Sequence, residues 1–242
     1  MKVTKEMGVA ASDVFAGKSG QSAVQALYGE TASLFVDLIG HNTTLSKCRL
    51  LDAGAFKGEL MSSVMELNGH RELFEITATD INESALAQNA IADRKVVADL
   101  SVLPFNNREF DIVCARYVLV WNVLAKQKRI LRELNRVAGL TVLQHAGADD
   151  VGTSEWQGRM HALLGGKVSK LFRNECHFSS AQEVECQLDE LGIAYERIQH
   201  RRVDFVSQVL IERFKLDANE AAEVLKTLGE KDYILQTTWL IK

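Results

Sequence analysis

Short apolar runs alternate with amphipathic helical stretches along the first 147 residues. The runs at 49–53, 74–79, 96–98, 111–115 and 141–144 are typical of strands buried on both faces of a parallel sheet. Between them, Leu60, Met61 and Val64 recur at helical spacing, Asn82 can cap a helix through about Ala92, and 130–137 has one apolar face. The alternation predicts an α/β, doubly wound, mostly parallel sheet with helices on both faces.

The last third follows a different pattern. Two capping boxes, Ser180 to Glu183 and Asp217 to Glu220, each precede apolar residues at helical spacing. A strand is expected over 195–203, another helix over about 206–214, and a final strand over 233–241. Leu216 is placed to pack on Ala221, and Gly229 is a helix stop.

Composition and charge narrow the class of protein. The chain has 242 residues, one proline, 47% hydrophobic residues and a formal charge of −4, which favours one compact domain over 1–242 and no nucleic-acid partner. No apolar run reaches the roughly 20 residues that span a bilayer. Without an apolar leader or paired cysteines, we expect a reduced, cytoplasmic protein without a metal site. The basic residues within 197–202 are expected to lie on a solvent-exposed strand at the edge of the sheet.

The strongest chemical signal is the strand–turn–helix segment 50–60. Asp52 ends the apolar run, Gly54 permits a tight turn, and Gly58 lies where the next helix begins, so backbone amides can face a polar ligand. In open parallel sheets, ligands bind beyond the carboxyl ends of the strands. Glycines in such a turn also have a purely structural interpretation.

Two further acids follow neighbouring strands. Asp80 closes the second strand, 22 residues after Gly58, near the spacing at which an acid receives ribose hydroxyls. Asp99 follows the third strand, where a carboxylate can accept a hydrogen bond from an exocyclic amine. The alternative is that both cap turns or helices.

The order of these motifs resembles the class I S-adenosylmethionine-dependent methyltransferases, of the small-molecule type with a ubiquinone/menaquinone-methyltransferase-like core. The matching segments are 50–60, 75–82, 96–105, 110–121 and 129–139, with a weaker similarity at 233–242. The resemblance implies seven strands, the last one antiparallel, S-adenosylmethionine as cofactor, and methyl transfer to an O, N or C atom of a small molecule by in-line displacement.

The resemblance also assigns residues. It places the loop at Asp52, Gly54, Ala55, Phe56 and Gly58, the ribose acid at Asp80 with Ile81 against adenine, the adenine-amine acid at Asp99 with Leu100, and the methionine side at Arg116 and Tyr117. Phe56 departs from the family, which has glycine there. His145, at the end of the fifth strand, is the candidate base, and a structural histidine is its alternative.

Helical caps and two rival functions complete the expectations. Segments 1–47, 148–178 and 204–231 are expected to cap the core at 48–147, with Val206, Leu210 or Phe214 near the methyl group. One rival is a non-catalytic cofactor-binding or interaction module, motivated by Phe56. The other is an NAD-dependent oxidoreductase, because that fold also uses a glycine turn and an acid after its second strand.

Overall fold

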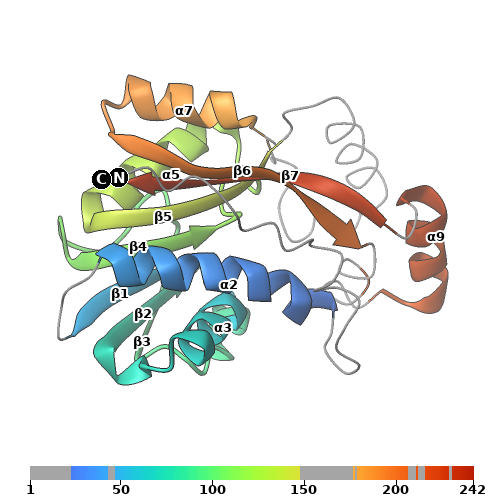
Figure 1. Ribbon diagram of the computed structural model, residues 1–242, viewed down its shortest axis with the longest axis horizontal. Helices are drawn as coiled ribbons and strands as arrows, with labels where there is room; N and C mark the ends of the chain where they lie inside the picture. The colour runs from blue at the N-terminus through green and yellow to red at the C-terminus, as the bar shows by residue number, and fades with distance from the viewer. Residues whose placement is uncertain are drawn as a thin grey trace.

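The computed structural model describes residues 23–42, 47–147, 177, 179–206, 211, 216–228 and 231–242, and shows one seven-stranded sheet between helices (Figure 1). The strands are β1 (Cys48–Ala53), β2 (Phe74–Asp80), β3 (Arg94–Val97), β4 (Phe110–Arg116), β5 (Ala138–Gly147), β6 (Tyr195–Val206) and β7 (Lys231–Ile241). The helices are α2 (Ala23–Asn42), α3 (Glu59–Asn68), η1 (Arg71–Leu73), α4 (Glu83–Ala87), α5 (Leu124–Val137), α7 (Ala181–Glu190) and α9 (Ala218–Leu228).

The sheet order is β3-β2-β1-β4-β5-β7-β6. The pairs β3–β2, β2–β1, β1–β4 and β4–β5 are parallel, whereas β7 is antiparallel to both β5 and β6. The expected fold class is therefore confirmed. Strand order reverses between β1 and β4, so the carboxyl ends of these two strands form the switch point at which such sheets bind ligands.

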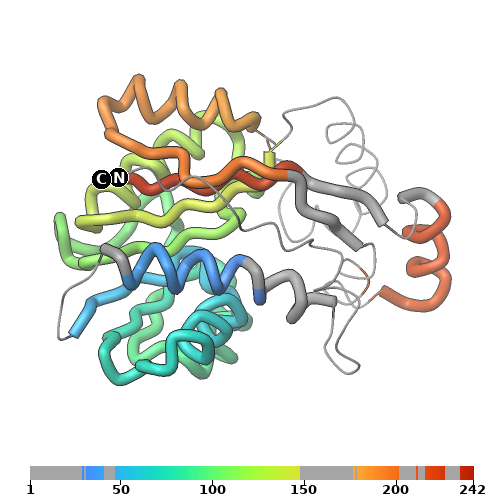
Figure 2. Tube along the Cα trace, viewed as in Figure 1, coloured from blue at the N-terminus to red at the C-terminus, as the bar shows by residue number. Residues whose placement is uncertain are grey.

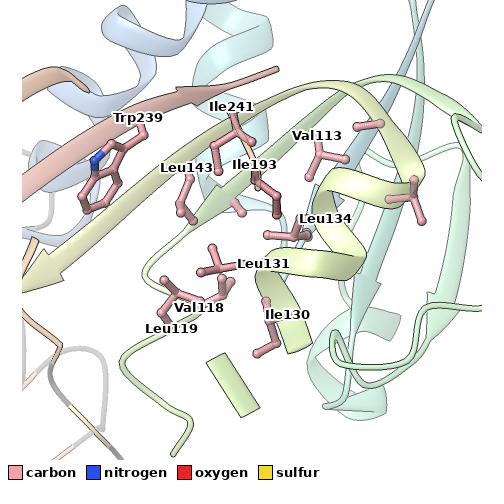
Figure 3. Close-up of a cluster of buried hydrophobic side chains, with 14 of the residues drawn as sticks. Val113, Val118, Leu119, Ile130, Leu131, Leu134, Leu143, Ile193, Trp239 and Ile241 are labelled. Carbon is pink, nitrogen blue, oxygen red and sulfur yellow. The ribbon is translucent and has the colours of Figure 1, made fainter. Parts of the chain in front are cut away.

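Two apolar clusters hold the helices on opposite faces of the sheet. On one face, Phe35 and Ile39 of α2 pack with Met61 of α3 against Leu50 and Val142. On the other face, Leu131 and Leu134 of α5 pack with Trp239 and Leu143 (Figure 3). Val184 of α7 belongs to the same cluster. These side chains are almost completely buried. Burial of this apolar surface is the main favourable term that fixes the sheet and its carboxyl edge.

Several element boundaries differ from the sequence expectation. The helix expected over 82–92 is wrong in length, because α4 ends at Ala87. The Asn89 side chain accepts hydrogen bonds from the backbone N–H groups of Ile91 and Ala92, which stabilises a turn instead of a further helical turn. β3 starts and ends earlier than expected, at 94–97, because it pairs in register with Thr77–Asp80. β5 begins directly after α5 and is longer than expected.

Both capping boxes are confirmed. Ser180 accepts from the backbone N–H of Glu183, and Glu183 accepts in return from the N–H of Ser180. Asp217 and Glu220 exchange the same pair of hydrogen bonds before α9. Gly229, the expected helix stop, lies outside the described residues.

The expected caps fall partly within the described residues. Within 1–47, helix α2 packs on the sheet beside α3, as a layer of the core. Within 204–231, helix α9 lies to one side of the sheet (Figure 2), and β7, which follows it in the chain, pairs antiparallel with β6. The side chains of Val206, Leu210 and Phe214 lie outside the described residues, as does most of 148–178. No helix in the described part of the chain is long and apolar enough to cross a membrane.

Candidate cofactor site

The loop after β1 is tied to the end of β2. The backbone N–H groups of Gly54 and Ala55 both donate to the carbonyl oxygen of Thr79, at 2.9 and 3.0 Å. Gly54, Phe56 and Gly58 have φ values of 73°, 49° and 82°. This series of left-handed residues turns the chain sharply from β1 into α3.

The two glycines of the loop are required by packing as well as by their φ values. A Cβ on Gly54 would lie 2.5 Å from Cγ1 of Val118, and a Cβ on Gly58 would lie 2.7 Å from the Asn89 amide. Leu100 also approaches Gly54, at 3.8 Å from the same Cβ position. The loop is therefore in close contact with the segments that follow β3 and β4. The two glycines are needed for this packing whether or not the loop also binds a ligand.

Phe56 occupies a left-handed conformation that favours glycine. We expect Phe56→Gly to change the free energy of unfolding by no more than about 1 kcal/mol, because relief of roughly 1–2 kcal/mol of backbone strain offsets the entropy that glycine loses on folding. Phe56→Val is the matched control, since a β-branched residue is poorly tolerated at positive φ, and should destabilise. Urea unfolding of both variants measures this, and equal destabilisation would contradict the strain argument.

Asp80 closes β2 and accepts two backbone hydrogen bonds. The N–H of Phe56 donates to Oδ2 and the N–H of Asn82 donates to Oδ1, both at 2.8 Å. The side chain is only partly buried, and each oxygen retains a second lone pair. Asp80 therefore joins the glycine loop to the start of α4 and still presents acceptor positions at the carboxyl edge.

Asp99 lies two residues beyond β3, at the same edge. Its Oδ2 is 2.8 Å from Nζ of Lys126, and its Oδ1 accepts from the N–H and hydroxyl of Ser101. Burial raises its pKa, but the hydrogen bonds from Lys126 and Ser101 outweigh that effect and hold the pKa below its usual value. Lys126 was missed by the sequence reasoning, since nothing along the chain connects it with Asp99.

Apolar side chains accompany the two acids. Ile81 is 69% exposed directly after Asp80, and Leu100 is partly buried after Asp99. A large aliphatic side chain this exposed at a sheet edge suits contact with a flat apolar group, because burying it would be favourable.

Asp52 is buried under the loop. It is 4% exposed, and its Oδ2 has no hydrogen-bond partner within the described part of the structure. Burial, with the nearby negative charges of Asp80 and Glu59, raises its pKa to about 7. A buried carboxylate oxygen without a hydrogen-bond partner can accept from a cationic group, and such a group would favour the ionised form of Asp52.

A polar network lies between β4, β5, β7 and helix α2, where sequence reasoning identified only Arg116 and Tyr117. Oε1 of Gln144 accepts from Nε of Arg116 and from the hydroxyl of Thr31, and its Nε2 donates to Thr238. Tyr117, with φ 55°, donates its N–H to the Gln144 carbonyl, and the Arg116 guanidinium lies 4.0 Å from the centre of its ring. Gln236 of β7 donates to the Tyr117 hydroxyl at 2.6 Å. The alternation of polar and apolar residues along β5 and β7 does not predict that these side chains contact one another.

His145 faces the opposite side of the sheet from Gln144, toward Ser179 at the start of α7. Its side chain is fully buried, its Nε2 lies 2.8 Å from the carbonyl oxygen of Ser179, and its ring is near Trp239. Burial lowers its pKa to about 4. Its Nδ1 has no hydrogen-bond partner among the described residues. A role as general base stays a prediction, which this placement does not favour.

The comparisons with known proteins agree with this geometry. Residues 51–139 match a family model described as a methyltransferase domain, and the matched segment contains the glycine loop, Asp80, Asp99 and Arg116. This segment is therefore a class I S-adenosylmethionine-dependent methyltransferase domain, with S-adenosylmethionine as its cofactor. A comparison with curated proteins gives no match.

Solved structures share the fold at low sequence identity. The YcgJ protein from Bacillus subtilis is 16% identical, with a TM-score of 0.68 over 88% of this chain and 97% of that chain. Magnesium protoporphyrin IX methyltransferase from Synechocystis, solved with bound SAH, is 14% identical, with a TM-score of 0.53 over 94% and 92%. The [4+2]-cyclase SpnF is 18% identical, with a TM-score of 0.60 over 94% and 85%. At these identities the similarity shows the fold alone, and the cyclase illustrates that this fold does not fix the reaction.

Proposed function

We propose that the protein transfers a methyl group from S-adenosylmethionine to an O, N or C nucleophile of a small molecule. The observation that carries the proposal is the meeting of the glycine loop, Asp80 and the 99–100 segment at the switch point, within the segment that matches a methyltransferase domain. The finer similarity to ubiquinone and menaquinone methyltransferases remains a prediction.

The residues present fit the cofactor. The open acceptor positions of Asp80 suit the ribose hydroxyls, and Ile81 and Leu100 suit the adenine faces. Asp99 suits the adenine amine through the second lone pair of its Oδ2, beside Lys126. Asp52, with its bare oxygen under the loop, suits the positive end of the methionine portion. Arg116 and Tyr117 lie at the end of the neighbouring strand, on the methionine side in this assignment.

The chain's main contribution to catalysis is alignment. When bound, the cofactor supplies a methyl group on a positively charged sulfur, which is already electrophilic. Asp80 and the glycine loop would fix the direction of that methyl group, and holding an acceptor in line lowers the entropic barrier. A side chain that removes a proton is needed only where the acceptor is a hydroxyl or a protonated amine.

The two rival functions differ in their support. The antiparallel β7 departs from the all-parallel order of dinucleotide-binding dehydrogenases, which disfavours an NAD-dependent oxidoreductase. A non-catalytic cofactor-binding module is favoured by one observation, that Phe56 rather than glycine occupies the strained loop position beside Asp80.

Calorimetric titration and a transfer assay together test the proposal. We expect S-adenosylmethionine and S-adenosylhomocysteine (SAH) to bind and NADH not to bind, and labelled methyl groups to pass from S-adenosylmethionine to a small acceptor in an acceptor panel. Binding without transfer to any acceptor would favour the non-catalytic module. Binding of NADH alone would overturn the proposal.

Asp80→Ala should weaken S-adenosylmethionine binding about tenfold or more. Hydrogen bonds to a charged group contribute about 1.5–3 kcal/mol, and this variant removes both the ribose acceptors and the anchor of Phe56. Glu83→Ala, three residues further on and exposed, is the matched control and should bind normally. Unchanged affinity in a folded Asp80→Ala protein would count against the assignment of Asp80.

A further inference from the structure

Gln236 and Tyr117 form an incompletely satisfied hydrogen-bonding pair beyond the cofactor loop. Gln236 is 1% exposed, and its Nε2 donates to the Tyr117 hydroxyl, but its Oε1 has no hydrogen-bond partner among the described residues. Buried polar atoms are nearly always hydrogen-bonded, so an exception of this kind requires an explanation. A ligand is one such explanation.

The pair is held in place from several sides. Tyr117 has φ 55°, a strained value for a tyrosine, and its N–H is fixed by the Gln144 carbonyl at 2.7 Å. The Arg116 guanidinium packs on its ring. Strained, over-determined residues of this kind gather at ligand sites. Ala146, which is paired with Gln236 across β5 and β7, has no polar side-chain atom that could bond to the amide.

The hydrogen-bonding capacity of the pair defines the chemistry of its ligand. The Tyr117 hydroxyl accepts from Gln236, which leaves its own proton to donate, while Oε1 of Gln236 can accept. Exchanging the two ends of the amide reverses the direction of the bonds but again leaves one donor and one acceptor. A carboxylate offers only acceptors and an ammonium only donors, whereas a hydroxyl offers both on one oxygen.

We propose that Tyr117 and Gln236 are specificity-determining residues that orient a hydroxyl group of the methyl acceptor. The proposal rests on the proposed function and deepens it, because it assigns a hydroxylated acceptor class to the site. The hydroxyl oxygen accepts from Tyr117 and its proton is donated to Gln236. Both residues act here by positioning the acceptor, and the pair lies on the face of the sheet that carries Arg116 and Gln144.

The test compares phenol with anisole, its methyl ether, which accepts a hydrogen bond but cannot donate one. Both are titrated into the SAH-loaded protein while the ¹⁵N side-chain amide signal of Gln236 is followed by NMR. That signal is identified by its absence in Gln236→Leu. We expect phenol to bind about fivefold more tightly than anisole and to shift the Gln236 signal, since one neutral hydrogen bond distinguishes the two probes.

The variants decide whether the pair is responsible. The preference for phenol should disappear in Gln236→Leu, whereas Tyr117→Phe removes the donor from which both probes accept and should weaken the binding of both about equally. The preference should persist in Thr237→Val, a buried neighbour on β7 that faces the other side and contacts His200. Equal binding of the two probes by the parent protein, or a preference that survives in Gln236→Leu, overturns the inference. If Gln236→Leu fails to fold, the parent comparison and Tyr117→Phe still decide.

The outcome for SAH separates this inference from the proposed function. If SAH binds and the two probes bind equally, the acceptor assignment is wrong and the proposed function stands. If SAH does not bind, the proposed function fails, whatever the probes do.

Discussion

Asp52→Asn should raise the free energy of unfolding at pH 8 by up to roughly 4 kcal/mol. The Asp52 pKa rises from its usual 3.8 to about 7 in the folded protein, through burial and the charges of Asp80 and Glu59. The folded state therefore holds a proton between these values that the unfolded state has lost. The resulting stability is fully present below pH 3.8 and is lost as the pH rises through about 7, at about 1.4 kcal/mol per unit.

Urea unfolding of the cofactor-free protein between pH 4 and pH 8 measures this effect. The difference between Asp52→Asn and the parent should be near zero at pH 4 and increase with pH. Glu66→Gln, an exposed carboxyl on α3, should show no such increase. A difference that does not depend on pH would show that Asp52 is ionised in the folded protein throughout this range.

His145→Gln should raise the free energy of unfolding relative to the parent as the pH falls, by about 3 kcal/mol, which is the opposite pH dependence to that of Asp52→Asn. Burial lowers the His145 pKa from 6.5 to about 4, so the unfolded state binds a proton in this range that the folded state does not. The stability that neutral His145 contributes is present above pH 6.5 and is lost as the pH falls through about 4. Gln can still donate to the Ser179 carbonyl but does not titrate.

The control for this variant is His70→Gln, since His70 is exposed at the other edge of the sheet. Relative to the parent, His145→Gln should gain stability as the pH falls from 6.5 to 4, while His70→Gln should not. The absence of any gain would show that His145 is protonated in the folded protein. Between pH 4 and 6.5, rising pH lowers the free energy of unfolding of the parent protein through Asp52 and raises it through His145. The two effects offset each other in the parent, so the variants are needed to separate them.

Local patterns predicted most of the elements, because each depends on residues close in sequence. The apolar runs located β1, β2 and β4, and the two capping boxes were read from four-residue spacings. The end of α4 was missed because Asn89 stabilises a turn through its side chain, which helical spacing alone does not reveal. Local patterns also could not place β7 between β5 and β6, since that position depends on pairing between distant segments.

The residues of the candidate site also divide into those that local patterns predict and those whose positions depend on distant parts of the chain. Asp80 and Asp99 could be proposed because each follows a strand, and the parallel sheet brings strand ends to one edge. Gln144 and Gln236 could not, because their hydrogen bonds join positions 28 and 119 residues away along the chain. The orientation of His145 toward α7 also depends on which face of β5 the core covers.

The place of β7 bears on how the sheet assembles. β7 follows every other strand in the sequence, yet it is an interior strand, and within the described residues β6 pairs with the sheet only through it. β6 therefore joins the sheet only through this last, 11-residue strand, which is paired on both of its sides. Pairing between segments far apart in sequence slows folding, and strand edges that stay unpaired can associate between chains. Loss of β7 would therefore leave both edges of β6 and one edge of β5 unpaired, so its pairing protects the sheet against association between chains.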